Sequence, residues 1–516
     1  NFTSATNAYN TAVGDSAGAA VTTGTHNNFF GGLAGDALTD GAANVAIGFA
    51  ALSSDTRGHS SVAIGHGALG AQNFTSTTDT FNTAVGKLAG TAVTTGVQNT
   101  LIGALSGDSL TDADLNVAVG MQALTTDTLG SKSVAMGFFA LGSQNFTSAT
   151  DTFNVAVGHS AGSAVTTSIQ NTLIGALSGD SLTTGSENTA VGYLALSTED
   201  GHGTNTAIGN RALMTQNVGA NAHNTGVGHY AGTAVTTGLR NTLIGGLAGD
   251  ALTDSDDNVA IGQTALGSDT LGSKSVAVGR AALATQNFTS ATDSYNTAVG
   301  FQAGEAVTTG LKNTIIGGIA GDLTTTGDFN TFIGYDVGSS NVGGDNNTIV
   351  GAGSNVAATG TDAAVGLGPN ISCVAAFTTL GSGASDIRAA HGNVTWATVS
   401  DQRYKKDIVN STAGLSFIND LTPRTFKYKN LGELPETFNA YKADSTDVFK
   451  NSVTNHGFIA QEVKTAIDAH PELKDGFALW GERPDGGQEV GEAALIPMLV
   501  KAVQELSTSL DAALAR

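Results

Sequence analysis

The chain contains little cysteine, little proline and, before residue 400, few basic residues. The scarcity of cysteine and of basic residues excludes or disfavours particular structural and functional classes. One of its 516 residues is cysteine, Cys373, so no intrachain disulfide can form. Only six prolines are present, the first at Pro369. No run of about 18 apolar residues occurs, so we expect no membrane insertion. Residues 1–399 contain only 9 Lys and Arg against 27 Asp and Glu. This acidity argues against a nucleic-acid partner.

The composition changes sharply at residue 400. Glycine accounts for 61 of the first 399 residues but for only 8 of the last 117, which contain 13 Lys and Arg. We therefore expect a repetitive shaft over 1–366, a β-rich junction or cap over 367–399, and a separate C-terminal domain over 400–516. The chain begins inside a repeat, because NFTS at residue 1 recurs at residue 73. It is therefore expected to be a fragment or a processed product.

A five-residue motif, such as NVAIG at 44–48 or NTAVG at 82–86, recurs along the shaft. Its closing glycine returns after 17 residues in most steps, with one longer step in each block of about 72. Seventeen residues cannot build a core of their own, so stacked neighbours must supply one. The short β-branched motif lies between turn-forming residues, which favours strands. The sequence predicts a mainly β fold, a parallel β-solenoid with one coil per motif.

These motifs resemble the head repeats of trimeric autotransporter adhesins over about residues 10–366. The resemblance implies a left-handed β-roll in each chain and a homotrimer of parallel chains. The solenoid pattern alone would also permit a monomer.

Acidic residues recur in the shaft, but their spacing does not favour a metal site. The equivalent aspartates of successive blocks lie about four coils apart, roughly 19 Å, so they cannot form a carboxylate ladder. We expect them to cap turns, with no metal and no cofactor. Only three glutamates precede residue 400, and none lies in an evident cluster with aromatic residues, so no enzyme activity is expected in the shaft. The aspartates are Asp36, Asp108, Asp180, Asp250 and Asp322.

The longer step of each block contains NFTS or a close relative, and its extra residues are predicted to bulge from the rod. Phe2, Phe74, Phe146 and Phe288 would lie on these bulges. They are interpreted either as hydrophobic plugs between three chains or as surface studs that face a receptor.

The C-terminal residues predict a small α+β domain. We expect helices over 413–421 and 461–467, strands over 424–429 and 456–460, and a final helix from Ile496. Four residues of that helix are spaced as in a coiled-coil seam, which predicts a trimer helix. The alternative is an amphipathic helix packed on its own domain. The seam residues are Leu499, Val503, Leu506 and Leu510.

Three blocks of this domain, VSDQRYKKDI at 399–408, HGFIAQEV at 456–463 and LIPMLVKAVQEL at 495–506, resemble the C-terminal intramolecular chaperone of phage endosialidases, tail spikes and tail fibres. The resemblance implies a domain that trimerises the fibre and then cuts itself off between Val399 and Ser400.

By position, the resemblance makes Ser400 the nucleophile and Lys405 the base, at most for a single-turnover autoproteolysis. A serine needs a base, and lysine serves when burial makes it neutral. Asp401 and Arg403 are expected to fix the turn or to polarise the carbonyl. Lys406 is a neighbour that could be mistaken for the base.

These observations together predict a homotrimeric tail fibre of a virion, extracellular when it acts. Its expected partners are a host cell-surface glycan or protein receptor and other virion tail proteins. Two alternatives stay open: a bacterial cell-surface trimeric autotransporter adhesin, and a tail spike that depolymerises capsule or lipopolysaccharide.

Overall fold

The computed structural model describes residues 7–393, 396–398, 400–473 and 477–516. The chain divides into two compact units, Asn1–Val399 and Ser400–Arg516, called the shaft unit and the C-terminal unit below. Within the described residues, no helix combines the length and the apolar character needed to cross a membrane.

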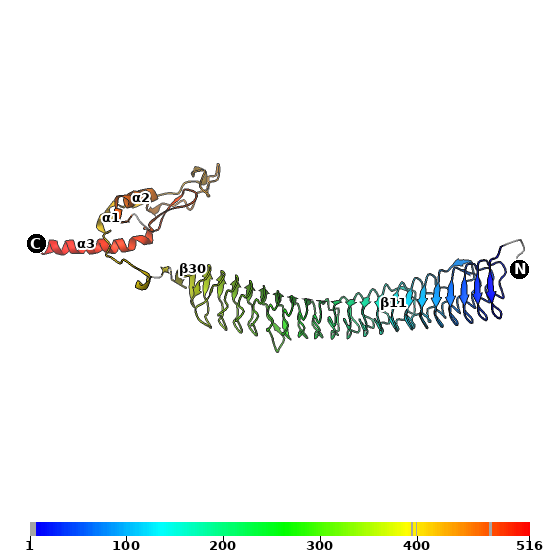
Figure 1. Cartoon of the computed structure of the whole chain (residues 1–516). Coiled ribbons are helices and arrows are strands. Elements are labelled where there is room, and N and C mark those ends of the chain that lie inside the picture. The colour runs from blue at the N-terminus through cyan, green and yellow to red at the C-terminus, as the bar shows by residue number, and fades with distance from the viewer. Residues whose placement is uncertain (1–6, 394–395, 399, 474–476) are drawn as a thin grey trace. The chain divides into compact units, whose positions relative to one another are not determined.

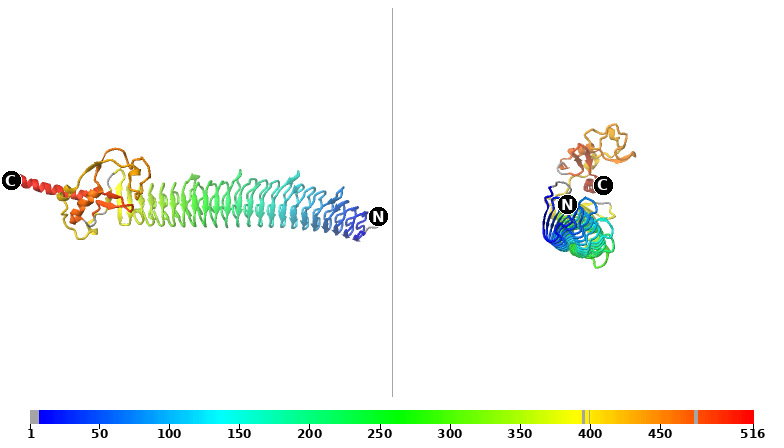
Figure 2. Two further views of the ribbon diagram at one scale, coloured as in Figure 1. Left: turned by 90° about the horizontal axis from the view of Figure 1, so that it is seen from above. Right: turned by 90° about the vertical axis from the view of Figure 1, so that its right-hand side faces the viewer.

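The shaft unit is a parallel β-solenoid of about 22 coils, which confirms the predicted mainly β class. Its strands stack as successive rungs (Figure 1), and the coils overlie one another when the unit is seen from its end (Figure 2). Each strand pairs with the next in parallel and in register, as Ala118 with Ala135. The three-residue rungs are β1 (Thr11–Val13), β2 (Asn28–Phe30), β3 (Val45–Ile47), β5 (Val62–Ile64), β7 (Thr83–Val85), β8 (Thr100–Ile102), β9 (Val117–Val119), β11 (Val134–Met136), β13 (Val155–Val157), β14 (Thr172–Ile174), β15 (Thr189–Val191), β16 (Thr206–Ile208), β17 (Thr225–Val227), β18 (Thr242–Ile244), β19 (Val259–Ile261), β21 (Val276–Val278), β23 (Thr297–Val299), β24 (Thr314–Ile316), β25 (Thr331–Ile333), β26 (Thr348–Val350) and β28 (Val365–Leu367).

The core of the shaft unit is a narrow column inside the single chain. The middle residue of each rung after β1, such as Ala118 or Leu243, is buried, because side chains alternate between the two faces of a strand. Further Ala and Leu residues from the turns complete the column. Cys373 lies at its end, where burial raises the pKa of the thiol to about 11. The thiol therefore stays protonated and packs as a small apolar group.

A row of glycines follows the rungs because the backbones of successive coils approach one another closely there. Gly245 has a φ of +134°, and a Cβ at this position would lie 2.6 Å from the carbonyl oxygen of Gly262. Glycine alone combines this φ with this approach. The motif glycine is thus required by the stacking of the coils.

The asparagine that opens each motif forms a buried ladder through the shaft unit. Asn99 Oδ1 accepts the backbone N–H of Asn116 at 3.0 Å, and Asn99 Nδ2 donates to the carbonyl oxygen of Ala113 at 2.8 Å. One side chain therefore satisfies a donor and an acceptor of the next coil. The same two bonds recur in most coils, as at Asn241, and they account for the asparagine at this position.

In three of the longer steps a serine replaces the ladder asparagine, and a buried polar cluster fills the gap. Gln144 Nε2 donates to Asp127 Oδ2 at 2.5 Å and to Ser133 Oγ at 2.9 Å. Asn154 Nδ2 in turn donates to Gln144 Oε1. Pairs of two-residue strands accompany these steps, with a fourth pair near the end of the shaft: β4 (Gly58–His59) with β6 (Thr78–Asp79), β10 (Gly130–Ser131) with β12 (Thr150–Asp151), β20 (Gly272–Ser273) with β22 (Thr292–Asp293), and β27 (Asn355–Val356) with β29 (Ser372–Cys373).

The interpretation of the long-step phenylalanines as surface studs is wrong. Phe74, Phe146 and Phe288 are each only 6% exposed. The N–H of Phe146 donates to the buried carboxylate of Asp127, which draws the ring into its own chain. Because so little of each ring is exposed, the rings have little surface with which to plug a gap between chains. The residues that directly follow each phenylalanine are exposed instead. Phe2 lies outside the described residues.

The parallel stack ends in an antiparallel sheet. Strand β30 (Phe377–Ser382) pairs in parallel with β28 and antiparallel with β31 (Ser385–Ala390). Strand β32 (Ala397–Thr398) then pairs antiparallel with β31. The last rung therefore does not present an open edge.

The C-terminal unit is a small α+β fold. Each helix and strand expected from the sequence is present, within a few residues of its predicted bounds. A hairpin over residues 480–490 was not predicted. Phe417, Val463 and Leu479 are among its buried core residues. Its elements are η1 (Gln402–Tyr404), α1 (Leu415–Asp420), β33 (Arg424–Phe426), η2 (Leu431–Glu433), β34 (Asn455–Gly457), α2 (Ala460–Ala469), η3 (Pro471–Leu473), β35 (Trp480–Glu482), β36 (Gln488–Val490), η4 (Glu492–Leu495) and α3 (Ile496–Leu514).

Candidate functional site

Ser400 and Lys405 are brought together at the start of the C-terminal unit. Lys405 Nζ lies 2.7 Å from Ser400 Oγ. The short helix η1 turns the chain between them, and Lys405 then returns to extended backbone. The spacing of five residues thus becomes a direct contact between a hydroxyl and an amine. Among the described hydrogen bonds, this contact belongs to Lys405 and none belongs to Lys406.

Asp401 and Arg403 fix this turn. Asp401 Oδ1 accepts the backbone N–H of Arg403 at 2.8 Å and so caps η1. The guanidinium of Arg403 also donates to both carboxylate oxygens of Asp401, from Nε at 3.1 Å and from Nη2 at 2.6 Å. These bonds, the side-chain pair first, lower the pKa of Asp401 and raise that of Arg403. Both residues therefore hold the turn that carries the Ser400 and Lys405 side chains.

The surroundings of the pair differ from the expectation that the lysine is buried. Ser400 and Lys405 are both exposed in the single chain. Residue 399, the other half of the expected scissile bond, lies outside the described residues. The structure therefore places a hydroxyl group beside an amine, and the described part of one chain does not enclose them.

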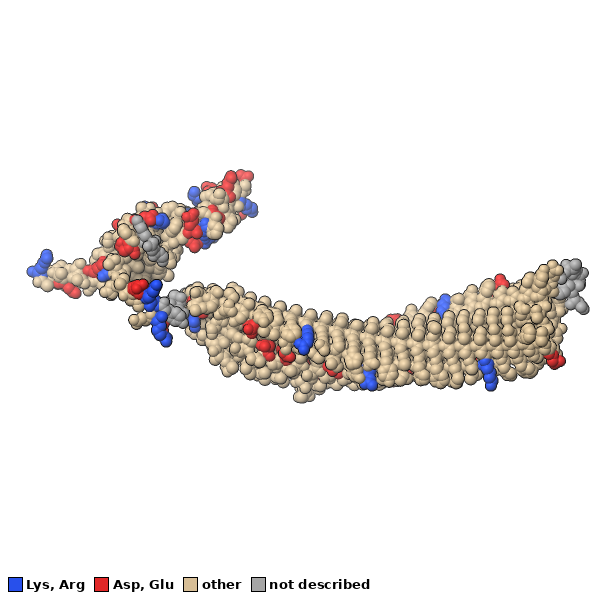
Figure 3. Space-filling model, viewed as in Figure 1, with Lys and Arg blue, Asp and Glu red and all other residues tan. Residues whose placement is uncertain are grey.

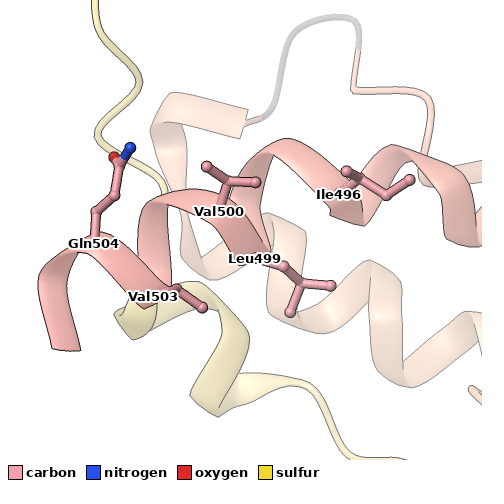
Figure 4. A pocket seen from close by; sticks show the side chains of 5 residues that line it. All are labelled: Ile496, Leu499, Val500, Val503 and Gln504. Carbon is pink, nitrogen blue, oxygen red and sulfur yellow. The ribbon is translucent and has the colours of Figure 1, made fainter. Parts of the chain in front are cut away.

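The final helix presents the second candidate surface. Helix α3 packs on α1, and Glu505 accepts the backbone N–H of Leu415 at 2.8 Å. Leu499 and Val503 lie one turn apart on the side that carries a shallow apolar hollow (Figure 4). The four predicted seam residues are 45–64% exposed, so this face of α3 is exposed to solvent in the single chain. They are Leu499, Val503, Leu506 and Leu510.

A third surface, which sequence reasoning missed, follows the shaft unit. The third residue of many rungs is apolar and exposed, for example Ile102, Met136 and Ile174. Apolar residues that follow the motif glycine, such as Phe138 and Phe301, are exposed as well. The motif contained a signal for this surface, because its strand has apolar residues at positions that face outward as well as at those that face the core. The visible face of the shaft unit carries few charges, unlike the C-terminal unit (Figure 3).

The recurrent aspartates were expected to cap turns, and three of their carboxylates accept backbone N–H groups of their own turn, at Asp180, Asp250 and Asp322. Asp108 Oδ1 accepts from Thr125 Oγ1 of the next coil at 2.5 Å. In other copies burial raises the pKa of the carboxyl group, opposed by the residue's own backbone N–H. These residues are Asp180 and Asp250.

Comparison with known proteins gives one match, and it falls on the unit that holds the Ser400–Lys405 pair. Residues 400–471 match the family model described as chaperone of endosialidase. The match to this chaperone family begins at Ser400, the first residue of the C-terminal unit. Searches of curated proteins and of solved structures returned no match. A β-solenoid joined to an endosialidase-chaperone segment fits a tail-fibre-like or tail-spike-like protein.

Proposed function

We propose that three copies of this chain assemble into a fibre of a virion tail, and that the C-terminal unit guides assembly and then cuts the chain between Val399 and Ser400. The observation that supports this most directly is the 2.7 Å contact between Lys405 Nζ and Ser400 Oγ at the start of the family match. A cut there separates the two compact units and opens neither.

The proposed cleavage uses neighbouring groups only. Ser400 Oγ attacks the carbonyl carbon of residue 399, which lies next to it in the chain, so no encounter step is needed. The neutral amine of Lys405 takes the hydroxyl proton and returns it to the departing backbone nitrogen of Ser400. The peptide C–N bond breaks as an ester to Oγ forms. Water then hydrolyses the ester, which leaves a carboxylate on residue 399 and a free amino group on Ser400.

We infer that assembly activates this pair. A lysine acts as a base when burial favours its neutral form, and Lys405 is exposed in the single chain. Neighbouring copies in a trimer would cover the Lys405 side chain and reduce the hydration of its amine. Cleavage would then follow assembly, so that an unassembled chain keeps its chaperone segment.

The bare apolar surfaces support two further copies of the same chain as the partners. On α3 the exposed seam has heptad spacing, and heptad seams pack against other helices. Along the shaft the exposed apolar residues repeat with the coil, so a parallel copy would meet the same residues at the same height. A slip by one coil would conserve most of these contacts. Assembly that starts at α3 removes this ambiguity.

For host contact we propose the row of exposed aromatic residues at the turn before the ladder asparagine. Phe81, Phe153 and Tyr295 are half-exposed there. Lys132 lies over the ring of Phe153 and Lys274 over that of Tyr295, each at 5.3 Å from the centroid. Aromatic faces beside charged groups suit the apolar and hydroxyl faces of a glycan.

The cleavage is tested by the intact mass of the denatured protein. Wild type is expected to give two species divided at Val399–Ser400, whereas Ser400→Ala and Lys405→Ala give one full-length chain. Lys406→Ala is the matched control and should cleave as wild type does. A single full-length wild-type mass would overturn the autoproteolytic part of the proposal, and so would normal cleavage of Lys405→Ala.

Assembly is tested by sedimentation equilibrium of the same proteins. Wild type should be trimeric, and the double variant Leu499→Ser/Val503→Ser should be monomeric and at least tenfold less cleaved. Ser509→Asp, an exposed polar position on the same helix, serves as control. A monomeric wild type would contradict the trimer, and full cleavage of a monomeric variant would contradict activation by assembly.

A further inference from the structure

One coil of the shaft unit differs from its equivalents at four successive positions, residues 199–202. In three blocks the buried carboxylate of the long step is an aspartate followed by Thr and, three residues later, by Gly, as in Asp127-Thr128-Leu129-Gly130. The remaining block has Glu199-Asp200-Gly201-His202 at this place. Glu199 keeps the structural bonds of its counterpart, because Gln216 Nε2 donates to its Oε2 at 3.1 Å.

Three of these changes, at Glu199, Asp200 and His202, belong together sterically. At Gly130 a Cβ would lie 2.2 Å from Asp127 Oδ2, so the usual coil excludes any side chain at the position of His202. Thr128 Oγ1 donates to the carbonyl oxygen of Phe146, a bond that Asp200 cannot make as a carboxylate acceptor. The coil therefore gives up a structural hydrogen bond and gains an imidazole and a second carboxylate.

These new groups converge on one point. One ligand atom from each of Glu199, Asp200 and His202 lies within 4.8 Å of the others. His202 Nδ1 is 3.7 Å from Glu199 Oε1, too far for a hydrogen bond. The same nitrogen is shielded from solvent and has no hydrogen-bond partner among the described residues. An unpartnered ring nitrogen thus faces a fully buried carboxylate at 3.7 Å, without a direct hydrogen bond between them.

Neighbouring coils hold this arrangement in place. The backbone N–H of Thr183 donates to the carbonyl oxygen of Asp200 at 2.6 Å, and Asn188 Nδ2 donates to that of His202 at 3.2 Å. The N–H of His202 donates to Glu199 Oε1 at 3.2 Å. The loop is therefore fixed at its backbone before any ligand binds.

From this geometry we propose that Glu199, Asp200 and His202 Nδ1 bind one divalent transition-metal ion of the Zn²⁺ class, with water completing its coordination. Imidazole nitrogen with carboxylate oxygens is a ligand set that such ions prefer. Ligands about 2.1 Å from the ion bridge the 3.7 Å gap, as no direct bond does. Asp200 is exposed, so the ion can enter from solvent. The sequence predicted no metal in the shaft, because the departure is confined to one block.

The test uses the full chain without an affinity tag and Co²⁺ as the probe, since its visible absorption reports a nitrogen-containing coordination shell. Wild type should bind one Co²⁺ per chain, and Zn²⁺ should displace it. The triple variant Glu199→Asp/Asp200→Thr/His202→Gly restores the residues of the equivalent coils at the three ligand positions, so it should keep the far-UV circular dichroism and bind Co²⁺ at least about 100-fold more weakly.

Two single variants separate this site from other histidines. His202→Gln removes the ligand nitrogen with little change in size and should also weaken binding, whereas His66→Gln, which removes an exposed ring stacked on Phe49, should not. Wild type without bound Co²⁺ would overturn the proposal. Binding that survives both the triple variant and His202→Gln would overturn it equally. The outcome does not depend on the proposed function of the chain.

Discussion

The shaft unit and the C-terminal unit obtain their order in opposite ways. In the shaft a small set of contacts recurs with each coil: the asparagine ladder, the close approach of glycines and the in-register rung. In the C-terminal unit the key contacts are made once, such as the Lys405–Ser400 pair or the bonds between Asp401 and Arg403. Repetition yields length but no unique alignment between copies. The unrepeated unit can supply that alignment, which gives a physical reason to join the two.

The largest effect that separates these two kinds of order is expected from Gly245→Ala. The new Cβ would lie 2.6 Å from a carbonyl oxygen at a φ of +134°, so strain and overlap together should destabilise the shaft by more than about 3 kcal/mol. Guanidinium unfolding followed by far-UV circular dichroism measures this.

Gly246→Ala is the matched control for that substitution. A Cβ at Gly246 would have no neighbour closer than 4.0 Å, and Ala104 and Ala176 occupy the equivalent position in other coils. We expect a change within about 0.5 kcal/mol. Equal destabilisation by the two neighbours would contradict the assigned role of the glycine row.

A somewhat smaller effect is expected from Asn241→Ala in the ladder. The backbone N–H of Asn258 and the carbonyl oxygen of Ser255 would lose their buried partner, which should cost about 2–5 kcal/mol. The same unfolding experiment applies, with the exposed Asn210→Ala as control. A loss no greater than that of the control would show that water replaces the ladder amide.

The smallest effect is a pH dependence confined to the C-terminal unit. His470 Nε2 lies 2.8 Å from Asp420 Oδ2, and its Nδ1 lies 3.1 Å from Glu472 Oε1. The bond to Asp420, and next that to Glu472, raise the pKa of His470 despite its burial. This stabilisation is fully present below the unfolded pKa of about 6.5 and is lost as the pH rises through the higher folded value.

The pKa of Glu472 is lowered, first by its own backbone N–H and then by His470, so its contribution is lost as the pH falls below about 4.5. These two groups therefore favour the folded unit most between about pH 4.5 and 6.5. Unfolding followed by Trp480 fluorescence in a Trp396→Phe background should show decreasing stability from pH 6 to 9. His470→Gln should flatten that slope, and an unchanged slope would refute the assignment.

The period of the solenoid, its strands and the helices of the C-terminal unit were predictable because each rests on local spacing. The motif glycine marks every coil, and Pro497 suits the first turn of α3. The burial of Phe146 was not predictable in the same way, because it depends on Asp127, 19 residues earlier in the chain. A signal existed: serine replaces asparagine in the motif at Ser133.

The pairing of Ser400 with Lys405 was predicted from a resemblance to a known family. The structure places the two side chains within hydrogen-bonding distance. Their exposure could not be read from the sequence, since burial of a short segment depends on what packs against it. For the same reason the sequence did not reveal the group of Glu199, Asp200 and His202. These residues stand out only when their coil is compared with the equivalent coils.

The hydrogen bonds between rungs run along the stacking axis of the shaft unit, which has a mechanical consequence. A tension applied along this axis acts directly on those bonds, one coil after another. A coil that opens exchanges a rise of about 5 Å for some 17 residues of extended chain, roughly 55 Å. The shaft would therefore lengthen in uniform steps under load, with each opened coil relieving the force on the rest.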